Sequence, residues 1–154
     1  MKKYFIYETI IGEIYIACED NYITNLGFGR VNYELHETEI IHETYTQLSE
    51  YLDGKRKNFN IPLKIEGTEF QKSVWNALTM IPYGETRTYK DIAEQIGNPK
   101  SCRAVGNANN KNKIVIILPC HRVIGANGSL VGFGGGLDIK KKLLDIESKY
   151  QFSK

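Results

Sequence analysis

The chain has 154 residues, of which 42% are hydrophobic and 25% are charged, with a formal net charge of +2. This length can bury a hydrophobic core without disulfides or a metal, and the composition is that of an ordinary soluble protein. No apolar stretch approaches the roughly 20 residues of a membrane-spanning helix. The residues after Met1 lack the apolar core of a signal peptide, so we expect a cytoplasmic protein with no membrane partner.

The first part of the chain predicts a small antiparallel sheet followed by a helix. Runs of β-branched and aromatic residues predict strands over 4–7, 14–18 and 22–28, with turns near residues 12 and 20. Apolar residues at helical spacing predict a helix over 39–53, capped by a glycine at 54. Residues 59–63 predict an edge strand, because proline cannot donate to a ladder. We place a domain boundary near residue 65.

The second part predicts a mostly helical domain. Thr68 with Gln71 forms a capping-box pattern ahead of a helix that the Pro-Tyr-Gly sequence at 82–84 ends. Thr88 with Asp91 opens a second, short helix.

A third helix is predicted at the recognition position of a helix-turn-helix. Gly97 is predicted to close the second helix. Asn98 is the predicted N-cap of the third helix, and Pro99 is the predicted first residue of that helix. Two short helices joined by a tight glycine turn are typical of a helix-turn-helix. The exposed candidates for DNA contact are Lys100, Arg103, Asn107 and Asn110.

The rest of the chain surrounds a cysteine. The unbroken apolar run at 114–118 predicts one buried strand that ends just before Cys120. A glycine-rich loop at 125–136 follows, and then an amphipathic helix from about residue 138. This helix is expected to turn Ile139, Leu143, Ile146 and Tyr150 inward.

The charge is unevenly distributed along the chain, and two interpretations of this distribution stay open. Residues 1–65 carry a net charge of −3 and residues 66–154 a net charge of +5. This distribution is equally consistent with a surface that binds a polyanion and with an ordinary solvated surface.

The three cysteines form no C-x-x-C pair, and an odd count in a reducing cytoplasm predicts free thiols.

Cys120 is the candidate nucleophile, because His121 and Arg122 follow it directly. A thiol becomes nucleophilic when a base or a cation lies beside it. On chemistry alone, a buried structural cysteine next to a satisfied histidine is the preferred interpretation, since adjacent side chains of an extended chain point to opposite sides.

The wider sequence reverses that preference, because it resembles the O6-alkylguanine-DNA alkyltransferases. The sequence Pro-Cys-His-Arg-Val at 119–123 matches the active-site motif of that family, and the resemblance runs without a gap from about Phe70 to Glu147. It includes Tyr83-Gly84-Glu85, Thr88-Tyr89, Gly97-Asn98-Pro99-Lys100, Arg103-Ala104-Val105-Gly106, Asn112 and Gly135-Gly136-Leu137.

The resemblance implies DNA repair by stoichiometric transfer of an alkyl group from O6-alkylguanine to Cys120, with O4-alkylthymine as a second candidate substrate. It implies an α+β fold with a ribonuclease-H-like domain at 1–65 and a winged-helix domain at 66–154 that binds DNA and carries out the transfer. The expected partner is double-stranded DNA with a flipped, alkylated guanine. We expect a monomer that needs no cofactor.

The resemblance also implies catalytic roles. Cys120 accepts the alkyl group, His121 is its base through a water, and Glu147 orients His121. Tyr89 donates a proton or hydrogen bond to the guanine ring, and Asn112 ties together the turn that follows the recognition helix.

Further residues are implied to bind DNA and substrate. Arg103 would fill the gap left by the flipped nucleotide. Lys100, Asn107 and Tyr89 are further implied DNA contacts, and the implied pocket wall comprises Val123, Phe133, Gly134 and Gly135.

The sequence departs from the family in places. Phe133 stands where the family usually has tyrosine, and Gly134 where some members have serine, so we expect altered affinity or alkyl-group range. Some members bind zinc in the N-terminal domain. Here Cys18, His36 and His42 lack a fourth ligand, so no metal is predicted.

Two other functions stay open. Alkyltransferase-like proteins bind alkylguanine without transfer, but they lack the acceptor cysteine that this chain has at position 120. A cysteine hydrolase would use Cys120 and His121, with backbone donors from 132–136, and would turn over many times. That alternative leaves the basic helix-turn-helix unexplained.

Overall fold

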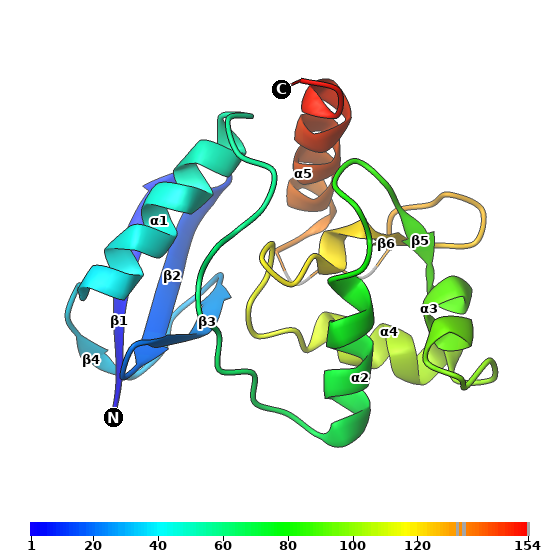
Figure 1. Ribbon diagram of the computed structural model, residues 1–154, viewed down its shortest axis with the longest axis horizontal. Helices are drawn as coiled ribbons and strands as arrows, with labels where there is room; N and C mark the ends of the chain where they lie inside the picture. Colours follow the sequence, from blue (N-terminus) through cyan, green and yellow to red (C-terminus); the bar gives the residue numbers. More distant parts are fainter. Residues whose placement is uncertain (132, 134, 154) are drawn as a thin grey trace. The chain divides into compact units, whose positions relative to one another are not determined.

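The computed structural model describes residues 1–131, 133 and 135–153. The chain divides into two compact units, Met1–Glu66 and Gly67–Lys154 (Figure 1). The first combines a sheet with a helix and the second is mostly helical, which confirms the α+β class. No helix in the described part of the chain is long and apolar enough to span a membrane.

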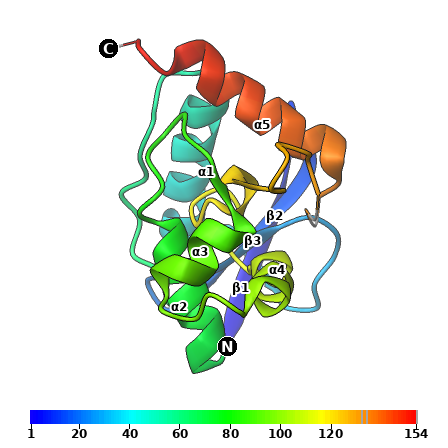
Figure 2. The same ribbon diagram turned by 90° about the vertical axis from the view of Figure 1, so that its right-hand side faces the viewer.

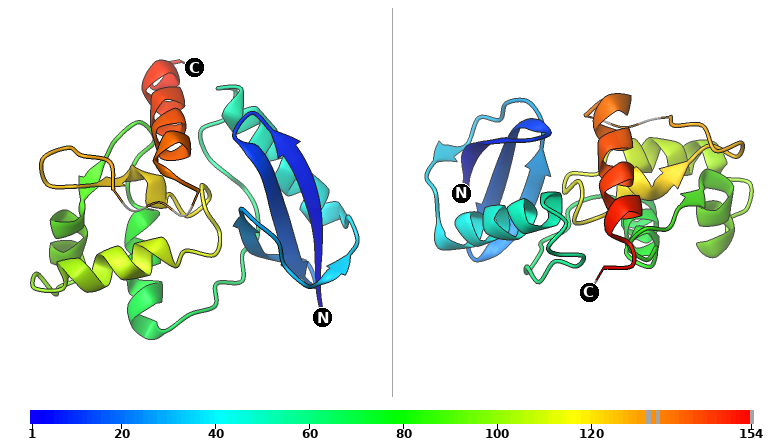
Figure 3. Two further views of the ribbon diagram at one scale, coloured as in Figure 1. Left: turned by 180° about the vertical axis from the view of Figure 1, so that it is seen from behind. Right: turned by 90° about the horizontal axis from the view of Figure 1, so that it is seen from above.

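The N-terminal unit is a sheet with a helix on one face. β1 (Lys2–Thr9), β2 (Gly12–Glu19) and β3 (Tyr22–Gly27) form the predicted antiparallel meander. β4 (Glu34–Leu35) adds a short parallel pairing to β1, so the order is β3-β2-β1-β4. α1 (Glu39–Leu52) covers one face, and Figure 3 shows the same layers from behind.

The predicted edge strand over 59–63 is wrong. Within this described segment, Leu63 alone bridges to β3, opposite Ile23. The Ile23 amide donates to the Pro62 carbonyl at 2.9 Å, while the Asn60 amide donates to the Gln47 side chain of α1 at 2.9 Å. Since Pro62 has no N–H, the pairing does not extend.

The C-terminal unit is built from α2 (Glu69–Leu78), α3 (Tyr89–Gln95), α4 (Cys102–Asn110) and α5 (Leu137–Tyr150). The first three of these helices pack against one another (Figure 2). Their buried side chains include Val74, Trp75, Leu78, Ile92 and Val105. β5 (Arg87–Thr88) pairs in parallel with β6 (Val123–Ile124), which joins the start of α3 to the segment after Cys120.

Two capping boxes explain where α2 and α3 begin. The Thr68 hydroxyl accepts from the Gln71 amide, and the Gln71 side chain accepts from the Thr68 amide. Thr88 and Asp91 make the same reciprocal pair at α3. Both caps confirm the predictions.

The predicted start of the third helix is wrong. α4 begins at Cys102, because Asn98 to Ser101 form a turn in which the Ser101 amide donates to the Asn98 carbonyl at 3.0 Å. Pro99 occupies the second position of this turn, where its fixed φ fits as well as in a first helical turn. Lys100 therefore precedes the recognition helix.

The apolar run at 114–118 is a tight buried turn and not the predicted strand. The Leu118 amide donates back to the Ile114 carbonyl at 3.0 Å, and the Ile117 amide donates to the Val115 carbonyl at 2.8 Å. Ile116 has φ 74°, a left-handed conformation that a β-branched residue rarely adopts. Apolar character alone does not separate a buried strand from a buried turn.

Candidate active site

Cys120 lies in a one-turn 3₁₀ helix, Cys120–Arg122, between the buried turn and β6. Its amide donates to the Leu118 carbonyl at 2.7 Å, and the residue is only 3% exposed. Because the backbone turns here, adjacent side chains are not constrained to opposite sides as they are in a strand. Burial raises the pKa of the Cys120 thiol to about 11, although the Asn112 side chain and the Lys140 charge act in the other direction.

Asn112 closes the turn that positions Cys120. Its Nδ2 donates to the Leu118 carbonyl at 2.7 Å, and its Oδ1 accepts from the Ile114 amide at 2.9 Å. One buried side chain therefore satisfies both ends of the buried turn at 114–118, whereas the resemblance implied a tie across the turn between the recognition helix and a strand.

His121 and Glu147 meet as expected, although 25 residues separate them in the chain. The His121 Nε2 lies 2.7 Å from Glu147 Oε2, and both side chains are essentially inaccessible to solvent. Burial lowers the pKa of His121, with Glu147 acting in the opposite direction, so the neutral imidazole is favoured.

Arg122 completes this cluster, although the sequence indicated it only as a cation next to Cys120 in the chain. Its Nε and Nη2 donate to the two carboxylate oxygens of Glu147 at 2.8 and 3.0 Å, while Nη1 donates to the Ile81 carbonyl at 2.7 Å. The Gly84 amide adds a further donor to Glu147 at 3.1 Å. Burial opposes ionisation, but the hydrogen bonds from His121 and Arg122 and the charge of Arg122 prevail and lower the pKa of Glu147 to about 2.

Lys140 is a second charged group that the sequence did not single out. It is fully buried, and its Nζ donates to the Val123 carbonyl at 2.5 Å and to the Val131 carbonyl at 2.7 Å. Burial lowers its pKa to about 8, partly offset by Cys120. Lys140 lies three residues before the buried Leu143 and seven before the buried Glu147. This helical spacing was the sequence signal that could have placed Lys140 on the buried face of α5.

The inward face of α5 therefore differs from the prediction. Leu143 is buried as expected, but Ile139, Ile146 and Tyr150 are only partly buried. The fully buried positions beside Leu143 are charged.

Tyr89, the first residue of α3, lies near the thiol. Its hydroxyl donates to the Val131 carbonyl at 3.0 Å, the same oxygen that Lys140 binds. Burial raises the pKa of Tyr89, and the proximity of Cys120 raises it further.

The remaining predicted residues fall into two groups. Arg103 and Asn107 are exposed on α4, and Lys100 is exposed ahead of it. On the expected pocket wall, Val123 is buried and Phe133 and Gly135 are partly exposed, while Gly134 lies outside the described residues.

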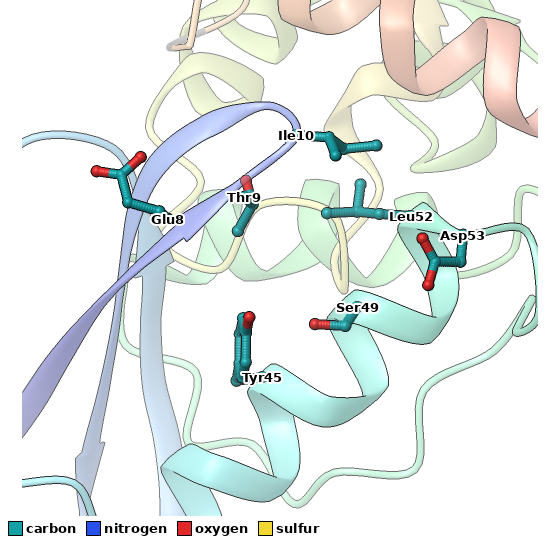
Figure 4. A pocket seen from close by; sticks show the side chains of 7 residues that line it. All are labelled: Glu8, Thr9, Ile10, Tyr45, Ser49, Leu52 and Asp53. Atoms are coloured by element: carbon teal, nitrogen blue, oxygen red, sulfur yellow. The ribbon is translucent and has the colours of Figure 1, made fainter.

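The N-terminal unit has a hollow of its own but no metal-ligand cluster. The hollow has a volume of about 390 Å³ and lies between the end of β1 and α1, where Ile10 and Tyr45 face it (Figure 4). Among the described residues of the chain, no group of three His, Cys, Asp or Glu side chains could hold a metal ion.

Fold and site together define a class of protein, a helix-turn-helix unit that carries a buried cysteine beside a His–Glu–Arg cluster. The family model for the 6-O-methylguanine DNA methyltransferase DNA-binding domain matches residues 69–149, and that for the ribonuclease-like domain matches residues 2–65. The chain belongs to the 6-O-methylguanine DNA methyltransferase family.

Relatives from archaea and bacteria match nearly the whole chain. A methylated-DNA–protein-cysteine methyltransferase of Methanosarcina acetivorans is 52% identical over 94% of this chain and 97% of its own length. The constitutive enzyme of Bacillus subtilis is 46% identical over 96% of both chains. The crystal structure of Mycobacterium tuberculosis OGT in complex with DNA is 42% identical, with a TM-score of 0.91 over 96% of this chain and 94% of that chain.

Proposed function

We propose that this protein repairs DNA by moving an alkyl group, typically methyl, from O6-alkylguanine to the sulfur of Cys120. The observation that carries the proposal is the buried thiol held beside the His121–Glu147–Arg122 cluster in a helix-turn-helix unit. The names of the relatives, methylated-DNA–protein-cysteine methyltransferases, support it.

The recognition helix would open the duplex. An O6-alkyl carbon inside the base stack is out of reach of a buried thiol, so the nucleotide must be flipped out, at a cost of a few kcal/mol. Arg103, exposed on α4, would enter the vacated space, and Lys100 and Asn107 would contact the backbone of the double-stranded DNA. The flipped base would lie between Tyr89 and a wall formed by Val123, Phe133, Gly134 and Gly135.

The chemistry needs one base and one acid. The thiol proton would pass through a water to the Nδ1 of His121, whose Nε2 is held by Glu147. Sulfur then forms a bond to the alkyl carbon as the bond from carbon to O6 breaks, and its electron pair goes to the guanine. Tyr89 would supply a proton to the ring and regain one from His121 through solvent, so the products are an S-alkyl cysteine and neutral guanine.

The reaction should occur once per molecule. A thioether is a poor leaving group, and the proposed base and acid have no means of removing the alkyl group from sulfur. No cofactor is needed, because the acceptor is the protein's own side chain. We further propose that a monomer acts, with a domain boundary near residue 65 and the DNA-binding and transfer functions in residues 66–154.

Intact-protein mass spectrometry with a duplex containing O6-methylguanine tests the proposal. The expected result is a gain of one methylene per molecule that stops at one equivalent and maps to Cys120, whereas Cys120→Ala binds the duplex without gaining mass. Binding without any mass change in the wild type would replace the proposal with a non-catalytic binding module. Repeated turnover on an ester or peptide would replace it with a hydrolase.

A further inference from the structure

The carbonyl oxygen of Val131 accepts hydrogen bonds from two side chains that belong to different helices. The Tyr89 hydroxyl, at the start of α3, donates to it at 3.0 Å, and the Lys140 Nζ, from α5, donates to it at 2.7 Å. A carbonyl oxygen has two lone pairs, so both bonds can exist at the same time. One donor can therefore leave while the other still satisfies the oxygen.

The two donors differ in how firmly they are held. Lys140 is fully buried and also donates to the Val123 carbonyl at 2.5 Å, so its amine bridges the two ends of the segment 123–131. The Tyr89 side chain is only partly buried, and its bond to Val131 lies near the surface. Rotation about the bond from the ring to the oxygen redirects the hydroxyl proton. Tyr89 is therefore the donor that can leave, and Lys140 is the donor that stays.

The backbone that carries Tyr89 is fixed. Thr88 caps α3 by accepting from the Asp91 amide at 3.0 Å. The pairing of β5 with β6 also places Thr88 opposite Ile124. A change of hydrogen-bond partner at Tyr89 thus involves its side chain and not the helix that carries it.

We propose that the Tyr89 hydroxyl exchanges the Val131 carbonyl for the guanine ring when the flipped base enters, and that Lys140 keeps the vacated carbonyl hydrogen-bonded. With the base in place, water is excluded from this contact. A buried carbonyl without a donor would then cost free energy comparable to that of a lost hydrogen bond. Lys140 removes that cost. It is a positioning residue, which acts through Val131 and Tyr89 rather than through contact with the base.

This inference rests on the proposed function, because the guanine ring is the new partner of Tyr89. It involves no covalent step and no change of protonation at Lys140, since a charged and a neutral amine both donate hydrogen bonds. Mass spectrometry of the wild type decides whether the alkyl group is transferred. The two experiments that follow decide whether Tyr89 changes its partner, so the two failures are separate results.

The first experiment is a double-mutant cycle that measures single-turnover transfer from O6-methylguanine in duplex DNA. Lys140→Met is expected to slow transfer roughly tenfold or more, because the carbonyl has no donor once Tyr89 turns to the base. In the Tyr89→Phe background, which has no hydroxyl to exchange, the factor is expected to be at least about fivefold smaller. Loss of the Val123 bond is common to both backgrounds and cancels in the cycle.

The control for this cycle is Lys141→Met, which lies on the exposed face of the same helix and should match the wild type. A merely structural role for Lys140 slows transfer by the same factor with and without the Tyr89 hydroxyl. Equal factors in the two backgrounds would overturn the proposal.

A second experiment keeps Lys140, so it does not depend on the folding of Lys140→Met. NMR follows the Cζ carbon of Tyr89 and the Nζ protons of Lys140 in Cys120→Ala while a duplex with or without O6-methylguanine is added. With the alkylated duplex, the Tyr89 signal is expected to shift while the Lys140 protons stay protected from exchange with solvent. An unchanged Tyr89 signal, or faster exchange at Lys140, would contradict the proposal. Failure of the alkylated duplex to bind at all would remove both this inference and the proposed function.

Discussion

A single carboxylate, that of Glu147, links several remote parts of the C-terminal unit. It accepts hydrogen bonds from Arg122, from the Gly84 amide and from the His121 ring. Since every partner is buried or partly buried, removing the charge leaves Arg122 as an uncompensated cation.

Glu147→Gln is expected to lower the free energy of unfolding by about 3–5 kcal/mol, the usual cost of breaking a buried pair. Urea denaturation measures this change. Asp145→Asn is the matched control, because Asp145 pairs with Lys141 on the exposed face of the same helix and should change stability by less than about 1 kcal/mol. Equal losses in the two variants would contradict the structural role given to Glu147.

The same carboxylate predicts how stability depends on pH. Its folded-state pKa of about 2 is depressed below the unfolded value of about 4.3, so its contribution is present above that unfolded value and is lost as pH falls toward 2. Unfolding free energies from pH 6 to pH 2 should therefore fall more steeply in the wild type than in Glu147→Gln. Parallel curves would mean that Glu147 titrates normally in the folded protein.

Arg103 allows DNA opening and chemistry to be separated. Arg103→Ala is expected to slow transfer from O6-methylguanine in duplex DNA far more than transfer from the free base, because only the duplex leaves a gap to fill. Single-turnover rates on both substrates measure the difference. Equal losses would remove the proposed intercalating role.

At the residue scale, the sequence predicted which side chains would gather but not how their charges pair. Cys120, His121 and Glu147 were indicated by a motif at family spacing. Arg122 was indicated only as a cation beside Cys120, because its bonds to the Ile81 carbonyl and to Glu147 depend on tertiary packing. Lys140 was overlooked, since a lysine in an amphipathic helix is normally assigned to solvent.

At the scale of elements, local signals were reliable and non-local ones were not. The capping boxes at Thr68 and Thr88 act within four residues, and both helices begin where expected. The run at 114–118 was misassigned because its backbone is satisfied by the Asn112 side chain, a partner that periodicity does not reveal. Pro99 suits both a turn and a helix start, so it gave an ambiguous boundary.

Thr88→Ala is expected to lower the free energy of unfolding by about 1 kcal/mol, because the amide of Asp91 loses its cap. Hydrogen exchange should become faster in the first turn of α3, where Tyr89 begins the helix. Thr86→Ala is the control, since the exposed Thr86 side chain caps no helix. If both variants exchanged alike, the cap would contribute nothing to α3.

For the whole molecule, the uneven charge predicts salt-sensitive DNA binding. The logarithm of the affinity for duplex DNA should fall linearly with the logarithm of salt concentration as counterions are released. Lys100→Ala should reduce the slope by about one, as for the loss of one phosphate contact. Lys55→Ala, an exposed lysine of the N-terminal unit, is the control, and an equal change in its slope would argue against a DNA surface centred on α4.

The dependence of Cys120 on α5 has a consequence during translation. Protein synthesis runs from the N-terminus, so Cys120 is made before Glu147 and leaves the ribosome before it. Until α5 has folded, Cys120 lies in the nascent chain without the carboxylate that holds its base, His121. We expect Cys120 to become reactive only after α5 has emerged and folded. The single alkyl acceptor of each molecule is then not used up by other electrophiles while the chain is still being made.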